Sequence, residues 1–142
     1  MAAPTPVTYT QWDGSSGFVY WRAEWATTDN FTDTVLVDIS GLSTVGPHSA
    51  VNSVKVTKVE AVTNGDIQAD LEFDAATDQP IYSFEGQSDV TVVQVMDFRD
   101  APNGARVPTT TAASFVGDIL LTTGNVASGD ELTLTVWFKR KT

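Results

Sequence analysis

Residues 53–73 read SVKVTKVEAVTNGDIQADLEF, and this stretch decides the class of fold. On both sides of Asn64-Gly65, apolar side chains occupy every second position: Val59, Ala61, Ile67, Ala69, Leu71 and Phe73. A period of two is the pattern of a β-strand with one buried face. Because an Asn-Gly pair between two alternating runs is the strongest short-range sign of a β-hairpin, we expect two antiparallel strands to be joined here.

The length of this loop follows from which side chains must be buried. A two-residue loop, Asn64-Gly65, would turn Lys58 and Glu60 toward the core. A three-residue loop that adds Thr63 keeps the apolar side chains together, with Gly65 in the left-handed conformation. The cross-strand pairs that we then expect are Ala61 with Ile67, Val59 with Ala69 and, on the outer face, Lys58 with Asp70.

The start of the first run has the opposite phase. Val54 and Val56 stand at even positions, whereas the apolar residues nearer the turn stand at odd positions. An extra residue in one strand of a pair reverses this phase. We therefore expect either a β-bulge near Thr57 or a strand that is covered on both faces.

The same period of two recurs along the chain. In residues 18–25 it places four side chains inward, namely Val19, Trp21, Ala23 and Trp25, and in residues 131–139 it does so for Leu132, Leu134, Val136 and Phe138. Valine and threonine make up 38 of the 142 residues, which favours strands over helices. Further strands are expected at residues 7–11, 32–39, 79–85, 90–97 and 118–123, which makes eight or nine in all.

Eight or nine strands without helices must bury one sheet against another. The predicted fold is therefore all-β, an antiparallel β-sandwich, and a jelly roll is one arrangement of strands that fits it. Residues 7–142 are predicted to form this single domain, preceded by a flexible arm at residues 1–6. Residues 99–114 contain two prolines and a Thr-Thr-Thr run and form an expected long loop, which is a common place for contacts with partners.

Composition argues against several kinds of chemistry. The chain has no cysteine, so thiolate nucleophiles and cysteine-based metal sites are excluded. A net charge of −10 disfavours binding to nucleic acid, and no apolar run is long enough for a membrane span. The N-terminus lacks the features of a secretion signal, so we expect a soluble protein that is not obviously exported. We also expect no cofactor, because no glycine-rich phosphate loop is present.

No catalytic site is predicted. The single histidine, His48, lies in a Gly-Pro-His-Ser turn without a nucleophile motif beside it. The acids Asp70, Glu72 and Asp74 alternate along one strand, as on a solvated face, whereas a glycosidase needs two carboxylates that flank a cleft. Two acidic segments, residues 29–33 and 97–100, lack the ligand spacing of a calcium loop, and no metal is assigned to them.

Outward aromatic rings and a basic C-terminal tip remain as candidate contacts. Exposed rings mark either protein contacts or platforms on which sugars stack. With the arginines of the long loop, the predicted partner-binding residues are Trp12, Phe18, Tyr20, Arg99, Arg106, Trp137, Lys139, Arg140 and Lys141. The alternative is that these rings are covered by the N-terminal arm or by the long loop.

Several stretches resemble the small virion structural proteins of tailed bacteriophages. They are residues 35–40, 70–78 and 117–123, together with Ser128-Gly129-Asp130 before a strand that ends in Lys139-Arg140-Lys141. The resemblance is discontinuous but spans most of the chain from Val35 onward. It rests on strand and turn patterns and not on chemical signatures.

The resemblance implies a capsid decoration or cement protein. Such a protein binds the major capsid protein, or another virion protein, on the outer surface of the assembled shell, after synthesis in the host cytoplasm. It is often a homo-oligomer, and it stabilises the shell because it binds only the assembled form. A tail or head-fibre adhesion component is also consistent with this resemblance.

Two other classes of protein remain open from the residues alone. A carbohydrate-binding β-sandwich module would also be acidic and would carry Trp and Tyr rings along a groove. A hydrolase would need acids from different strands that converge in a pocket.

Overall fold

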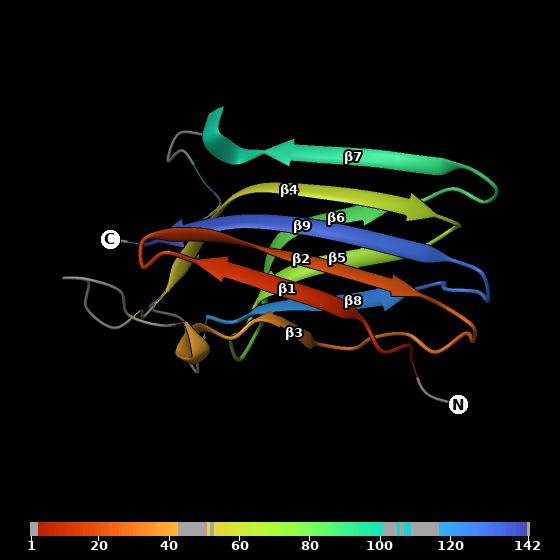
Figure 1. The fold of residues 1–142 in the computed structure, drawn as a ribbon, viewed down its shortest axis with the longest axis horizontal. Helices are drawn as coiled ribbons and strands as arrows, with labels where there is room; N and C mark the ends of the chain where they lie inside the picture. Colours follow the sequence, from red (N-terminus) through yellow and green to blue (C-terminus); the bar gives the residue numbers. More distant parts are fainter. Residues whose placement is uncertain are drawn as a thin grey trace.

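The computed structural model describes residues 3–42, 51, 53–100, 105, 107–108 and 117–141. These residues form nine strands and two short 3-10 turns (Figure 1). Their helical segments are three residues long each, and no helix among them is long or apolar enough to cross a membrane.

The strands form two antiparallel sheets that pack face to face (Figure 1). The five-stranded sheet has, in spatial order, β1 (Val7–Trp12), β2 (Ser16–Glu24), β9 (Glu131–Arg140), β4 (Val54–Asn64) and β7 (Thr91–Asp97). The four-stranded sheet has β3 (Thr34–Val37), β8 (Ile119–Gly124), β5 (Gln68–Phe73) and β6 (Gln79–Glu85). This order is that of a jelly roll, so the predicted β-sandwich is confirmed.

The core lies between the two sheets and is made by the expected inward side chains. Val19, Trp21, Ala23 and Trp25 are at most 3% exposed, and Leu132, Leu134, Val136 and Phe138 at most 1%. Burying an aliphatic side chain stabilises a fold by about 1.5–3 kcal/mol. The alternation of apolar residues therefore also sets which side of each strand faces the core.

The expected hairpin at Asn64-Gly65 is wrong. β4 lies in the five-stranded sheet and pairs with β7 and β9, whereas β5 lies in the four-stranded sheet and pairs with β6 and β8. The pairs predicted across this turn are therefore absent: Ala61 faces Gln94 and Leu134, and Ala69 faces Phe84 and Thr123.

The hairpin prediction failed because β4 and β5 both bury one face in the same interior. An inward period of two is satisfied equally when the second strand pairs beside the first and when it crosses to the opposite sheet. Gly65 has φ 113°, the left-handed region that was expected, but it serves a connection between sheets. Among the described strands, only two sequential pairs, β1–β2 and β5–β6, form hairpins within a sheet.

Of the two alternatives for the first run, a bulge near Thr57 or a strand covered on both faces, the structure has the bulge. The register between β4 and β9 shifts between Val56 and Lys58. The apolar residues on both sides of the shift are at most 1% exposed, namely Val54, Val56, Val59 and Ala61. The extra residue therefore turns the even-numbered valines before it and the odd-numbered residues after it toward the same face.

The predicted strand at residues 32–39 is shorter in the structure. It covers Thr34–Val37, and a 3-10 turn of Ile39–Gly41 follows. The Asp38 side chain accepts a hydrogen bond from the Ser40 N–H at 3.0 Å, which stabilises the turn at the expense of the strand.

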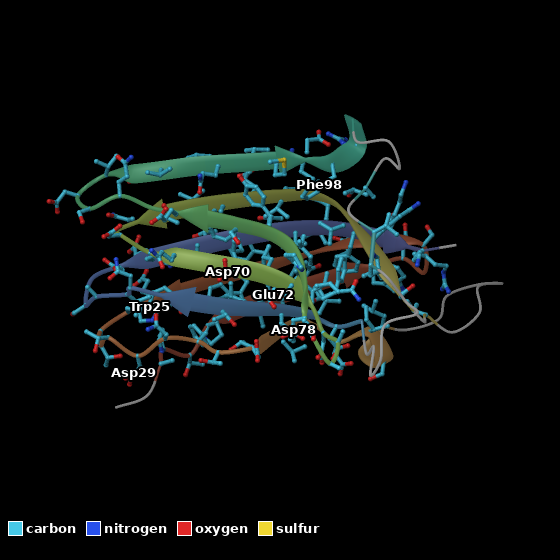
Figure 2. All side chains as sticks on the ribbon, turned by 180° about the vertical axis from the view of Figure 1, so that it is seen from behind. Trp25, Asp29, Asp70, Glu72, Asp78 and Phe98 are labelled. Atoms are coloured by element: carbon cyan, nitrogen blue, oxygen red, sulfur yellow. The ribbon has the colours of Figure 1, made fainter. Side chains whose placement is uncertain are left out.

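A loop between β2 and β3 is held against the core by buried contacts. The Trp25 indole donates a hydrogen bond to the Asp29 carbonyl at 2.9 Å (Figure 2). The Phe31 ring packs edge-on against Trp21 and Trp25, with centroids 5.2 and 5.7 Å away. This end of the sandwich is therefore closed by aromatic side chains.

Candidate binding face on the five-stranded sheet

The outward side of the five-stranded sheet carries most of the accessible aromatic rings. We call it the aromatic face. Its outward positions follow from the register and from the alternation of burial. They include Val7, Tyr9, Gln11, Phe18, Tyr20, Arg22, Lys58, Val62, Val93, Val95, Thr133, Thr135 and Trp137.

One row of side chains crosses all five strands of this face. The register places Gln11 beside Phe18, Phe18 beside Trp137, Trp137 beside Lys58, and Lys58 beside Asp97. We call these five residues the aromatic row. Directly opposite residues of antiparallel strands have Cβ atoms about 4.5–5.5 Å apart, so the row is continuous.

The rings in and beside the row are in contact. The Tyr9 and Phe18 centroids are 6.1 Å apart and their planes are tilted by 47°. The Lys58 Nζ lies 4.8 Å from the centroid of the Trp137 ring, within the range of a cation–π interaction. Trp137 is half-buried, so one part of its ring remains accessible.

A hollow of about 300 Å³ adjoins the row. The rings of Phe18 and Trp137 line it, and its polar lining comes from Gln11, Asp13, Ser16, Thr57 and Lys139. Asp13 is held in the β1–β2 turn, where its Oδ1 accepts hydrogen bonds from the N–H groups of Ser15 and Ser16 at 2.9 and 2.8 Å. The hollow thus combines ring faces with amide, carboxylate, hydroxyl and ammonium groups.

Three of the predicted aromatic residues lie on this face and one does not. Phe18, Tyr20 and Trp137 point outward as expected. The expected outward orientation of Trp12 is wrong, because its ring stacks on Phe138 with centroids 5.5 Å apart and packs against the core. In β1, Gln11 faces outward, so the alternation of the strand turns the next residue, Trp12, to the inward side with Thr10.

The predicted basic residues differ in how they are engaged. Arg99 binds the Asp97 carboxylate, and its hydrogen bonds lower the pKa of Asp97 below the usual range. Arg140 donates to the Gly14 carbonyl at 2.8 and 3.0 Å, and the Lys141 Nζ donates to the Pro108 carbonyl at 3.1 Å. Lys139 is exposed, and Arg106 lies outside the described residues.

Sequence reasoning missed Tyr9 and Lys58. Tyr9 is 58% exposed and lies directly opposite Tyr20. Its alternation with Val7 and Gln11 was a usable sign that it faces outward. The place of Lys58 was not visible, because it depends on the pairing of β4 with β9 and not with β5.

The opposite outer face, on the four-stranded sheet, is acidic. Its four strands contain no lysine or arginine. Asp70, Glu72 and Asp78 lie on this side (Figure 2). Burial, followed by the nearby charges of Asp78, Asp70 and Asp33, raises the pKa of Glu72.

The three alternating acids of the sequence do not act as one group. Asp70 is exposed and accepts a hydrogen bond from the Ser83 Oγ at 2.5 Å, while Glu72 and Asp74 are half-buried. In the described part of the chain, no three His, Cys, Asp or Glu residues gather closely enough to hold a metal ion. His48 lies outside it.

No protein-family model and no curated protein sequence matches this chain. Among solved structures, it is similar to the apo form of BiXyn10A CBM1, at 8% identity over 99% of this chain and 100% of the other, with a TM-score of 0.38.

Two further structures are similar at lower TM-scores. The N-terminal cellulose-binding domain of Cellulomonas fimi β-1,4-glucanase C shows 11% identity over 95% of this chain and 86% of the other, with a TM-score of 0.29. The capsular polysaccharide assembling protein CapF of Staphylococcus aureus shows 13% identity over 95% of this chain and 29% of the other, with a TM-score of 0.28. Similarity at this level carries neither a ligand nor a role to this chain.

Proposed function

We propose that this chain is a carbohydrate-binding β-sandwich module that holds a glycan on its aromatic face. The observation that carries the proposal is the hollow that Phe18 and Trp137 line together with polar side chains. The apolar side of a sugar ring stacks on aromatic rings, while its hydroxyl groups need hydrogen-bonding partners. Gln11, Ser16 and Asp13 supply such donors and acceptors.

The direction of the aromatic row suggests how a glycan lies. Neighbouring strands are about 4.8 Å apart, so the row from β1 to β7 is about 19 Å long. This length suits a short oligosaccharide that runs across the strands, with its rings over Phe18 and Trp137. Lys58 and Asp97 then lie at the far end of the row, where they reach hydroxyl groups of a longer chain.

The test is to titrate soluble cello-, xylo-, manno- and chito-oligosaccharides into the protein, with calorimetry and tryptophan fluorescence as readouts. Trp137→Ala removes the stacking ring, and we expect affinity to fall about tenfold or more, which equals about 1.4 kcal/mol. Trp137→Phe keeps a ring, so binding should persist while most of the fluorescence change disappears. Trp21 and Trp25 are buried and Trp12 stacks inward on Phe138, so these three rings should respond little.

A matched control removes a half-buried ring from the other sheet. Tyr82 in β6 stacks near Phe84, and Tyr82→Ala should leave glycan affinity unchanged. The proposal is overturned if none of the glycans binds at millimolar concentration, or if Trp137→Ala binds as well as the unchanged protein.

A protein-docking role on a virion is the second candidate function. It is favoured by a basic corner, in which Lys55 of β4 lies directly opposite Lys139 of β9. Like charges at opposite positions destabilise a sheet, and an acidic partner surface would relieve their repulsion. No ion pair within the described residues involves either lysine. The resemblance to phage virion proteins implies that this partner surface is the outer surface of the capsid.

This second candidate is tested by co-sedimentation with intact virions and with unassembled major capsid protein. A cement protein should sediment only with the assembled shell, and the double variant Lys55→Ala/Lys139→Ala should bind less at low salt. Lys58→Ala removes one charge elsewhere on the same sheet and serves as the control. If the protein stays in the supernatant with intact virions at low salt, the docking role is rejected.

A further inference from the structure

The two sheets have four edge strands, and they differ in how their edges are protected. Pro80 is the second residue of β6, and Pro6 directly precedes β1. β3 is only four residues long and has an irregular register between Val35 and Val37. Prolines, short strands and bulges are the usual means of preventing an edge from pairing with another chain.

The edge strand β7 has none of these protections. Its seven residues, TVVQVMD, contain neither proline nor lysine, and its register with β4 is regular throughout. On its other side it pairs with no described strand, and it lies at the free margin of the five-stranded sheet (Figure 1). Its outward N–H and C=O groups therefore offer a template for one more strand.

The side chains of β7 are also unusually apolar for an exposed edge. Val93 is 60% exposed and Val95 is 51% exposed on the aromatic face. Val62 of β4 lies directly opposite Val93 and extends this apolar surface inward from the edge. Three of the six exposed large hydrophobic residues in the described chain, counting Val90, lie on or next to β7.

We propose that β7 pairs antiparallel with β7 of a second copy of this chain, about a twofold axis at Gln94. The two five-stranded sheets then become one continuous sheet of two copies. Val93 lies opposite Val95 of the second copy, and Thr91 lies opposite its Asp97. Opposite residues of antiparallel strands point to the same side, so both aromatic faces look in one direction.

Charge and length select this register. Asp97 is the only charged residue of β7, and Arg99 of the same chain binds it. With the axis at Gln94 each Asp97 faces an uncharged threonine, and all seven residues of each strand have a partner. A shift of the axis by one residue would leave two residues of each strand unpaired at an end.

Sedimentation equilibrium of the whole chain tests the dimer. The mass should approach twice 15.2 kDa with rising concentration. Val93→Lys and, separately, Val95→Lys should restore the mass of one chain, because lysines at these positions lie in the apolar centre of the pairing. Val7→Lys, at an equally exposed valine on the opposite edge strand, should still dimerise. Circular dichroism must show unchanged unfolding for all three variants.

The register has its own test, because the chain has no cysteine. A mixture of Val93→Cys and Val95→Cys chains should form a mixed disulfide faster than either variant alone. Opposite Cβ atoms are about 4.5–5.5 Å apart, while diagonal ones are about 7–8 Å apart. A wild-type chain that remains monomeric, or a dimer that is lost in Val7→Lys but kept in Val93→Lys, overturns the proposal. Glycan binding is measured separately, so either proposal can fail alone.

Discussion

Thr123→Val should destabilise the protein by removing one buried hydrogen-bond acceptor. Thr123 is 5% exposed in β8, and its Oγ1 accepts a hydrogen bond from the Phe31 N–H at 2.9 Å. The same hydroxyl donates to the Asn30 side chain at 3.3 Å. Valine has nearly the same shape, so the change leaves the packing intact and leaves the buried Phe31 N–H without a partner.

The expected cost follows from that lost acceptor. A buried donor left unsatisfied costs about 1–3 kcal/mol. With a urea slope of about 2 kcal/mol per molar, the unfolding midpoint should fall by about 0.5–1.5 M while the slope stays the same. Because Phe31 packs on Trp21 and Trp25, an unchanged near-ultraviolet circular dichroism spectrum of the folded variant would show that this packing is intact.

Thr122→Val is the matched control on the same strand. The Thr122 Oγ1 accepts from the Asp33 N–H at 3.0 Å in an exposed setting, where water replaces the lost partner. Thr122→Val should lower the free energy of unfolding by no more than about 0.5 kcal/mol. The reasoning is refuted if Thr123→Val is as stable as the unchanged protein, or if both valine variants lose the same amount.

Two further changes separate backbone strain, steric contact and charge. In urea unfolding, Gly65→Ala should lower the free energy of unfolding by about 1 kcal/mol or more beyond the loss in Gly129→Ala. Both glycines have positive φ, so both variants carry backbone strain. Only at Gly65 would a Cβ also meet the Asp130 carboxylate, which the Ala127 N–H holds in place. Equal losses would show that strain alone acts. Glu72→Gln should raise the urea midpoint of unfolding at pH 7 and have little effect near pH 4. The raised pKa of Glu72 means that folding disfavours its charged form. The stability of the unchanged protein therefore falls as the pH rises above the ordinary pKa of 4.5, and glutamine removes this loss. A loss of stability at pH 7 would contradict this sign.

The fold class was predictable from local patterns, because each strand buries one face and alternation records which one. Residues 79–85 were predicted as a strand with the bounds of β6, and the bulge near Thr57 followed from a change of phase. The neighbours of each strand were not predictable in this way. The turn at Asn64-Gly65 has the chemistry of a hairpin but connects two sheets, because the same buried positions serve both arrangements.

The aromatic face was predictable only in part. Phe18, Tyr20 and Trp137 were expected to point outward, and they do. The assembly of Phe18 and Trp137 with Lys58 in one row, and the stacking of Trp12 on Phe138, depend on contacts between distant segments. No local pattern contains that information, since it arises when β9 inserts between β2 and β4.

By itself, the sequence determined an all-β chain, its strands, the inward side of most of them and the acidic balance of its surface. These properties follow from backbone propensity and from the period of two, which are local. Tertiary structure alone decided that the stretch at residues 53–73 spans both sheets, that Tyr9, Phe18, Tyr20 and Trp137 share one face, and that β7 pairs with only one of the described strands. Those outcomes depend on which strands lie side by side, and that choice is made by the packing of the whole sandwich.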